Sequence, residues 1–304
     1  MDTSINYIHN KPASFKARVI KFILAIVGVK KRLEKNMKGK LYAQEPARLP
    51  KALQNKFDVA VTEKKGRKIW TFKPKHKTSD KVVLYLHGGA YVFNISMFHW
   101  KFVEELLTKT NATIIVPDYP LAPQATCQDV FAFIQGIYID LLQSNVSPQN
   151  INIIGDSAGG GMALGFAQQL RDENKPQPAQ IILLSPWLDI TMSNAGINEA
   201  EKEDKMLGAK WLRLAGQMYA GASDGKDFRV SPIYGNLRGL GKISVFIGTH
   251  DLFISDCRKL KEMLDKANIS FNYFEYPKMF HAWMLVTSLE ESKQAIEQMA
   301  TILH

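Results

Sequence analysis

The sequence predicts an α/β protein built on a mostly parallel sheet that helices cover on both faces. Three observations lead to this prediction. Short apolar runs recur along the chain, as in VVLYL at residues 82–86 and INII at 151–154. Helix-like segments separate most of these runs. The runs are also continuously apolar rather than alternating, which is typical of strands buried on both faces.

The predicted sheet has about eight strands. In chain order the apolar or β-rich runs lie at residues 57–61, 68–72, 82–86, 112–116, 151–154, 181–184, 243–247 and 271–276. Helix-like segments lie near residues 97–109, 128–143, 158–170, 256–267 and 288–302. A chain of 304 residues is long enough for one large domain of this kind.

Residues 190–235 break the alternation of strands and helices. They contain an acidic run, NEAEKEDKM, and then a helix-like stretch, GAKWLRLAGQMYA. Ligand sites in open parallel sheets lie at the carboxyl ends of the strands. The segment therefore reads as an insertion between two strands that acts as a lid.

The net charge of +10 is unevenly distributed. Residues 1–81 contain 21 Lys and Arg against 6 Asp and Glu, a net charge of +15, and the rest of the chain carries −5. A solvated charged surface is the first interpretation of this asymmetry, and a basic face that meets an acidic surface, either nucleic acid or anionic lipid, is the alternative. The sequence has no zinc-finger or RRM-type signature, so we do not expect a nucleic-acid partner.

Residues 15–37 are predicted to form a basic amphipathic helix. Phe15, Val19, Phe22, Ile26 and Val29 fall on one face at helical spacing. The apolar run at residues 22–29 is far shorter than the about 20 residues that span a bilayer, and basic residues follow it where a signal peptide would be cleaved. Two roles stay open for this helix: packing onto the rest of the protein, and peripheral contact with an anionic membrane.

The chain has two cysteines, Cys127 and Cys257, and neither has a metal-like or CxxC spacing. This usage argues against a disulfide framework and favours a reducing compartment. We therefore expect a cytoplasmic protein, with a peripheral membrane location as the alternative, and no metal site.

The stretch GDSAG at residues 155–159 fits the pattern G-x-S-x-G. It follows a predicted strand and precedes a predicted helix, as in a nucleophile elbow, where a tight turn exposes the serine. The unpaired N–H groups and positive dipole end of that helix favour negative charge on a substrate oxygen. A phosphate-binding loop is a poor fit because G-x-x-x-x-G-K-[ST] is absent. Ser157 is thus the candidate nucleophile.

A serine hydroxyl needs a base, and the expected chain order is Ser, then acid, then His. Three histidines follow the candidate serine: His250, His281 and His304. His304 is the last residue, and His250 directly follows a predicted strand. His281 lies in a loop after the last β-rich run and is the expected base.

The acid should lie in the loop after the preceding strand. Asp251 does, just past the run at residues 243–247, and Asp256 is the second choice. Ser157, Asp251 and His281 therefore form the predicted triad. Asp251 would hold the imidazole in the correct tautomer and stabilise its cation.

A tetrahedral oxyanion needs N–H donors aimed at it. The loop HGGA, at residues 87–90, follows a strand of the same predicted sheet and so ends on the same rim as the elbow. We expect Gly88, Gly89, Ala90 and Ala158 to supply these donors from their backbones.

Together these motifs resemble the hormone-sensitive-lipase-like (bacterial family IV) branch of the α/β-hydrolase fold. The matching motifs cover about residues 57–304 in the family's order. They are HGGA (87–90), DYPLAP (118–123), GDSAGG (155–160), SPWLD (185–189), RVSPIYG (229–235), GTHDLFISD (248–256) and FHAW (280–283). Ala90 replaces the family's third glycine, a change that keeps the backbone N–H.

The resemblance implies a serine carboxylester hydrolase that acts through an acyl-enzyme, on small esters with short acyl chains, without metal or cofactor. It also implies a helical cap made of residues 1–55 and 190–235 over a core of residues 56–189 and 236–304. Two other functions stay open: a membrane-associated lipase, and a non-catalytic small-molecule receptor on the same scaffold. A homodimer is also left open.

Several side chains are expected to contact the substrate or to lie near its pocket. Tyr91, Asp156 and Trp187 are the expected contacts. Aromatic and methionine residues near the pocket suggest an apolar acyl or alcohol group; besides Tyr91 and Trp187 they are Phe93, Trp211, Met279 and Trp283.

Overall fold

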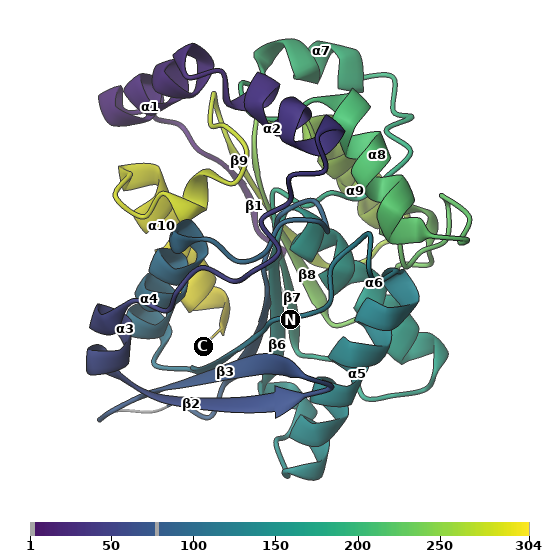
Figure 1. Cartoon of the computed structure of the whole chain (residues 1–304). Helices are drawn as coiled ribbons and strands as arrows, with labels where there is room; N and C mark the ends of the chain where they lie inside the picture. The colour runs from purple at the N-terminus through teal and green to yellow at the C-terminus, as the bar shows by residue number, and fades with distance from the viewer. Residues whose placement is uncertain (1–3, 77–78, 304) are drawn as a thin grey trace.

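The computed structural model describes residues 4–76 and 79–303 and contains a nine-stranded sheet at its centre. The strand order is β1-β9-β8-β7-β6-β4-β5-β3-β2 (Figure 1). The strands are β1 (Asn6–Ile8), β2 (Phe57–Lys64), β3 (Arg67–Pro74), β4 (Val82–Leu86), β5 (Thr113–Pro117), β6 (Ile151–Asp156), β7 (Gln180–Leu184), β8 (Lys242–Gly248) and β9 (Phe271–Tyr276). The terminal His304 lies outside the described residues.

The sheet is parallel except at one edge. β2 and β3 form an antiparallel hairpin, and β3 pairs antiparallel with β5. Eight strands match the predicted runs. The ninth, β1, pairs parallel with β9 over three residues, in a region predicted to be only helical. Three residues are too few for a periodicity signal.

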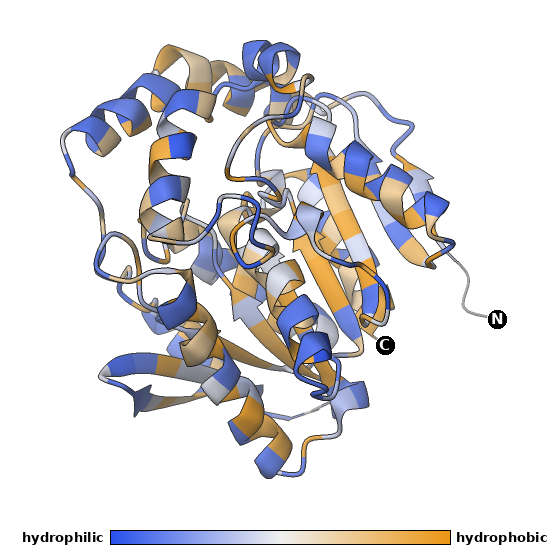
Figure 2. Ribbon diagram, turned by 90° about the vertical axis from the view of Figure 1, so that its right-hand side faces the viewer, coloured by the Kyte–Doolittle hydropathy of each residue, from blue (hydrophilic) through white to orange (hydrophobic). Residues whose placement is uncertain are grey.

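Helices cover both faces of the sheet, as expected. α5 (Cys127–Gln143), α6 (Ala158–Asp172) and α9 (Ile254–Lys266) contribute to the hydrophobic core on one face. α4 (Met97–Thr110) and α10 (Glu290–Leu303) contribute to the core on the other. Figure 2 shows hydrophobic central strands beneath helices whose residues vary between hydrophobic and hydrophilic. The short elements are α3 (Lys51–Lys56) and the 3-10 turns Pro148–Asn150, Pro232–Tyr234 and Trp283–Leu285.

Four helices gather at one end of the molecule. α1 (Phe15–Ile26) and α2 (Val29–Lys38) come from the N-terminal region, and α7 (Ile197–Glu203) and α8 (Ala209–Ala220) come from the insertion after β7. Although they are far apart in sequence, they lie together at the top of Figure 1. We refer to these four helices as the cap helices.

The predicted single helix over residues 15–37 is two helices. Gly28 adopts a left-handed conformation with φ +66° between them, which interrupts the helical hydrogen bonds. The apolar face that the spacing predicts also does not pack onto the rest of the protein. Phe15, Phe22 and Ile26 are 66–74% exposed, whereas Ile20 and Leu24 point inward. Helix α1 is apolar on two faces, and periodicity does not determine which one packs.

In the part of the chain that the structure describes, no helix combines the length and apolar character needed to cross a bilayer.

Candidate active site

Ser157 lies in a tight turn between β6 and α6. Its backbone has φ +54° and ψ −120°, a conformation that costs a non-glycine residue on the order of 1–3 kcal/mol. Two hydrogen bonds hold it there: its N–H donates to the Leu184 carbonyl at 2.8 Å, and its carbonyl accepts the Trp187 N–H at 2.9 Å. The turn therefore presents the serine hydroxyl at the carboxyl end of a central strand.

Two glycines make this turn sterically feasible. A Cβ on Gly155 would overlap the carbonyl oxygen of Gly159, and a Cβ on Gly159 would overlap that of Leu86. These neighbours are backbone atoms, which cannot swing aside as a side chain does. Both outer positions of the G-x-S-x-G motif therefore require glycine.

Ser157, His281 and Asp251 form one hydrogen-bonded chain. The Nε2 atom of His281 lies 3.0 Å from the Ser157 hydroxyl, and Nδ1 lies 3.0 Å from Oδ2 of Asp251. Asp251 is in the turn after β8, and His281 is in the loop after β9, so the ends of three strands bring them together. All three side chains are buried, with Ser157 8% and His281 5% exposed.

The surroundings make His281 more basic than an ordinary histidine. Burial of the ring acts to lower its pKa, but the charge and hydrogen bond of Asp251 outweigh this effect. The charges of Asp204 and Asp156 act in the same direction, and the net result is a raised pKa. A more basic imidazole is a better acceptor for the serine proton.

Asp256, the second choice for the acid, does not form a hydrogen bond with His281. It lies in α9 and accepts a hydrogen bond from Asn194 at 2.8 Å. Burial raises the pKa of Asp256 to about 6. The other downstream histidine, His250, contacts Lys21 and lies 3.7 Å from Glu203. Neither Asp256 nor His250 is hydrogen-bonded to Ser157 or His281.

The HGGA loop lies against the elbow, and one of its amides is already in use. The Gly88 N–H donates to Oδ1 of Asp156 at 3.0 Å, so it anchors the loop and is not available to a substrate. This corrects the expectation for Gly88. Among the described residues, the N–H groups of Gly89, Ala90 and Ala158 have no hydrogen-bond acceptor. Gly89 and Ala90 also line an apolar cavity that Ser157 borders.

Asp156, expected to contact the substrate, is instead buried, and its hydrogen bonds connect the elbow to β4 and the HGGA loop. Its carboxylate accepts the Tyr85 hydroxyl at 2.5 Å and the Gly88 amide, and lies 3.4 Å from Nε2 of His99. Burial alone would raise the pKa of Asp156, but His99 and Tyr85 bring it below its ordinary value. Although Asp156 borders the cavity, its oxygens already have partners within the protein.

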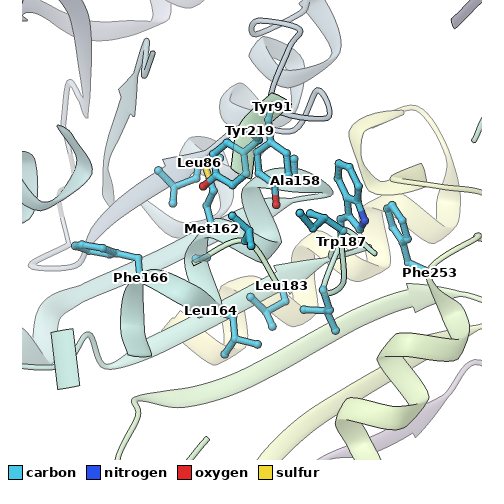
Figure 3. Packing of buried hydrophobic residues seen from close by; sticks show 14 of the residues in the cluster. Leu86, Tyr91, Ala158, Met162, Leu164, Phe166, Leu183, Trp187, Tyr219 and Phe253 are labelled. Carbon is cyan, nitrogen blue, oxygen red and sulfur yellow. The ribbon is translucent and has the colours of Figure 1, made fainter. Parts of the chain in front are cut away.

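Tyr91 and Trp187, also expected to contact substrate, lie in the core behind the elbow. Figure 3 shows them packed beside Tyr219 and Phe253. The rings of Tyr91 and Tyr219 stack with centroids 3.7 Å apart, and Trp187 is completely buried. Neither residue lines the cavity, so their aromatic character serves packing.

An apolar cavity of about 490 Å³ opens above Ser157 and His281. Its far wall comes from the cap helices and the loop before α8, and its near wall from the HGGA loop and the loop that carries His281. The apolar lining residues from the cap side are Ile20, Leu24, Leu33, Met206, Leu207, Trp211 and Leu212.

The remaining residues expected near the pocket divide into two pairs. Phe93 and Trp211 line the cavity. Met279 and Trp283 are buried in the hydrophobic core beneath it and do not reach the cavity wall. The sequence pattern alone does not separate the two pairs, because aromatic and methionine side chains suit a core as well as a pocket.

Asp204 lies beside Asp251, a position that the sequence pattern did not predict. It belongs to the acidic run of the insertion but is only 2% exposed. It accepts the N–H groups of Met206, Leu207 and Leu252. Burial, followed by the nearby charge of Asp251, raises the pKa of Asp204 to about 6. No local sequence signal distinguishes it from the solvated acids around it.

Within residues 4–76 and 79–303, no group of three or more His, Cys, Asp and Glu side chains is arranged to hold a metal ion.

Known proteins resemble this chain in both sequence and structure. The family described as the α/β hydrolase fold matches residues 83–285. An esterase of Acinetobacter venetianus is 29% identical over 230 residues, which cover 73% of this chain and 74% of the relative. An acetyl-hydrolase of Streptomyces hygroscopicus is 29% identical over 222 residues, with 73% and 74% covered. A solved esterase/lipase from an uncultured bacterium has a TM-score of 0.83 at 27% identity, over 96% of this chain and 98% of that one.

The chain therefore belongs to the α/β-hydrolase family. These relatives also confirm its resemblance to the hormone-sensitive-lipase-like esterases, and its reaction class is that of a serine ester hydrolase.

Proposed function

We propose that this protein hydrolyses small carboxylic esters with short acyl chains through an acyl-enzyme on Ser157, with His281 as the base and Asp251 as the acid of the triad. The hydrogen-bonded chain from Ser157 through His281 to Asp251, at the floor of an apolar cavity, is the observation that carries this proposal.

In the first half of the reaction, Nε2 of His281 takes the hydroxyl proton of Ser157 as Oγ attacks the ester carbonyl carbon. The carbonyl oxygen becomes an oxyanion, which the N–H groups of Gly89, Ala90 and Ala158 stabilise. The bond to the alcohol oxygen then breaks, and the alcohol leaves with the proton from His281. The acyl group remains on Ser157.

In the second half, water attacks the acyl carbon and gives its proton to Nε2 of His281. The second oxyanion collapses, the bond to Oγ breaks, and the carboxylic acid is released. His281 returns its proton to Ser157, which restores the starting state. Throughout, the Asp251 carboxylate stabilises the imidazolium that forms in each half.

Two features support a short acyl chain. The cavity, of about 490 Å³, is in the lower half of the range for small-molecule sites, and the cap side forms its far wall. Two similar proteins point the same way. One carries the name acetyl-hydrolase, and the solved structure of EstE5, 28% identical with a TM-score of 0.81, was soaked with p-nitrophenyl butyrate.

The test is turnover of p-nitrophenyl esters from acetate to palmitate by the wild type, Ser157→Ala and, as a control, Ser144→Ala at an exposed helix end. We expect acetate and butyrate to be hydrolysed fastest. We expect Ser157→Ala to lose several orders of magnitude in kcat and Ser144→Ala to keep its activity. Full activity of Ser157→Ala would refute the mechanism. Stoichiometric labelling of the wild type without turnover would favour the receptor instead.

A further inference from the structure

The outer face of α1, away from the cavity, carries a contiguous set of exposed apolar side chains. We call this set the apolar ridge. Their exposed fractions lie between 37% and 74%. Scattered exposed apolar residues are ordinary, but a contiguous patch of this kind marks an interaction surface. The ridge consists of Phe15, Val19, Phe22, Ile23 and Ile26 on α1 and of Val27 directly after it.

The ridge cannot be hidden by turning the helix. Ala17, on the opposite face of α1, is buried in the core, and Ile20 and Leu24 line the cavity above the catalytic serine. A rotation that buried the ridge would expose those residues to water. The packing of α1 therefore keeps the apolar ridge exposed. Its contact with water costs free energy, which a partner that covered the ridge would recover.

Basic side chains border the ridge. Lys16 and Arg18 lie on α1 itself, and the next helix, α2, carries exposed Lys31, Arg32 and Lys35. An apolar helix face flanked by cations is the pattern of helices that lie in the plane of an anionic bilayer.

A second cavity, of about 280 Å³, lies beside the ridge. We call it the basic pocket. The charges of two carboxylates act on its Lys21: Glu203, which lies 3.8 Å from the Lys21 amine and is 55% exposed at its side chain, and the buried Asp204. Phe22 belongs to both the ridge and this pocket. The polar residues that line the pocket are Arg18, Lys21, Lys205, His250 and Lys278.

The positive charge in the basic pocket is not neutralised. Among the described residues, Arg18, Lys205 and Lys278 form no ion pair. Burial lowers the pKa of Lys21, and the charges of Lys205 and Lys278 add to this effect against the opposing charges of Glu203 and Asp204. A concave site with excess positive charge concentrates anions.

We propose that the apolar ridge and the basic pocket together dock this protein on an anionic phospholipid bilayer, with the ridge among the acyl chains and the pocket around a lipid phosphate. Apolar burial and electrostatic attraction are the two signals that stable peripheral binding requires. A second copy of the chain is a poorer occupant, because it would bring two basic surfaces together. Docking would also place the cavity within the thickness of one helix, about 10 Å, of the lipid.

Co-sedimentation with vesicles tests this proposal independently of the reaction. We expect the full chain to bind phosphatidylglycerol vesicles, to bind phosphatidylcholine vesicles much more weakly, and to dissociate at high salt. Phe22→Ser with Ile26→Ser should weaken binding on the order of a hundredfold through lost apolar burial. Arg18→Gln with Lys205→Gln should weaken it about thirtyfold through lost charge.

Matched controls lie at the opposite end of the molecule in Figure 1. Val61→Ser removes an exposed apolar side chain from β2, and Lys68→Gln with Lys73→Gln removes two exposed charges from β3. Both controls should bind vesicles as the wild type does. Thermal melting followed by circular dichroism checks that every variant is folded.

Several results would overturn the proposal. One is that the wild-type protein does not co-sediment with phosphatidylglycerol vesicles, or that it binds phosphatidylcholine vesicles equally well. Another is wild-type binding by ridge or pocket variants that are shown to be folded. A dimer that Phe22→Ser with Ile26→Ser abolishes would show that a second copy covers the ridge. Stabilisation by inorganic phosphate without vesicle binding would assign the pocket to a soluble anion.

Discussion

The carboxylate of Asp204 accepts a hydrogen bond from the backbone N–H of Leu252, with 2.8 Å between the two atoms. Leu252 directly follows Asp251, so this bond joins the insertion that carries two cap helices to the loop that carries the proposed triad acid. The other oxygen of Asp204 accepts two amides of its own loop. One buried carboxylate thus links the insertion to the turn after β8, and its charge acts on His281.

Asp204→Asn should move the acid limb of the pH–rate profile to lower pH. His281 must be neutral to accept the serine proton, so activity is lost as the pH falls through its pKa. The Asp204 charge raises that pKa, and the amide removes the charge. The measurement is kcat/KM for p-nitrophenyl butyrate against pH.

Asp256→Asn is the matched control for this shift. Asp256 is also a buried carboxyl with a pKa raised to about 6, but its charge does not contribute to the pKa of His281. Its acid limb should coincide with that of the wild type. Equal shifts in the two variants, or none in either, would contradict the coupling between Asp204 and His281.

Asp251→Asn should lower kcat by about four orders of magnitude, because an amide at this position favours the wrong imidazole tautomer. Active-site geometry should persist, since the asparagine amide is nearly isosteric with the carboxylate that it replaces. Steady-state kinetics with p-nitrophenyl acetate provide the measurement. A larger loss in Asp256→Asn than in Asp251→Asn would reverse the assignment of the acid.

Gly159→Ala should destabilise the protein by on the order of 3 kcal/mol or more, because its Cβ would overlap the Leu86 carbonyl oxygen in a close-packed strand. Gly136→Ala in α5 is the comparison. Its Cβ would lie 2.6 Å from the Cε atom of Lys64, which is the mobile end of a side chain and moves at little cost. Urea denaturation should show little change or a gain of up to about 1 kcal/mol for Gly136→Ala. Similar midpoints for the two variants would show that the elbow tolerates a side chain.

Trp211→Ala should shift the acyl-chain preference towards longer esters. Trp211 forms part of the cap wall of the cavity, and its removal creates room for further methylene groups, each worth about 0.8 kcal/mol when buried. The ratio of kcat/KM for octanoate to that for acetate should rise by about tenfold. Leu214→Ala, on the exposed side of the same helix, should leave the ratio unchanged. An unchanged ratio in Trp211→Ala would place the acyl chain elsewhere.

The sequence alone predicted the parallel sheet, its covering helices and the three residues that the structure joins by hydrogen bonds. This prediction was possible because Ser157, Asp251 and His281 each follow a recognisable strand, and parallel topology brings the ends of such strands to one rim. Chain order therefore carried spatial information. The same reasoning found the HGGA loop, because it too follows a strand of that sheet.

Only the tertiary structure decided how individual groups are used. Tyr91 and Trp187 looked like pocket residues, but their rings pack behind the elbow. The Gly88 amide looked free, but a carboxylate 68 positions away accepts its hydrogen bond. Periodicity identified one apolar face of helix α1, but the face that lines the cavity is a different one, which carries Ile20 and Leu24. Periodicity and motif spacing describe the chain's local geometry, whereas packing and hydrogen bonding depend on neighbours that only the folded molecule brings into contact.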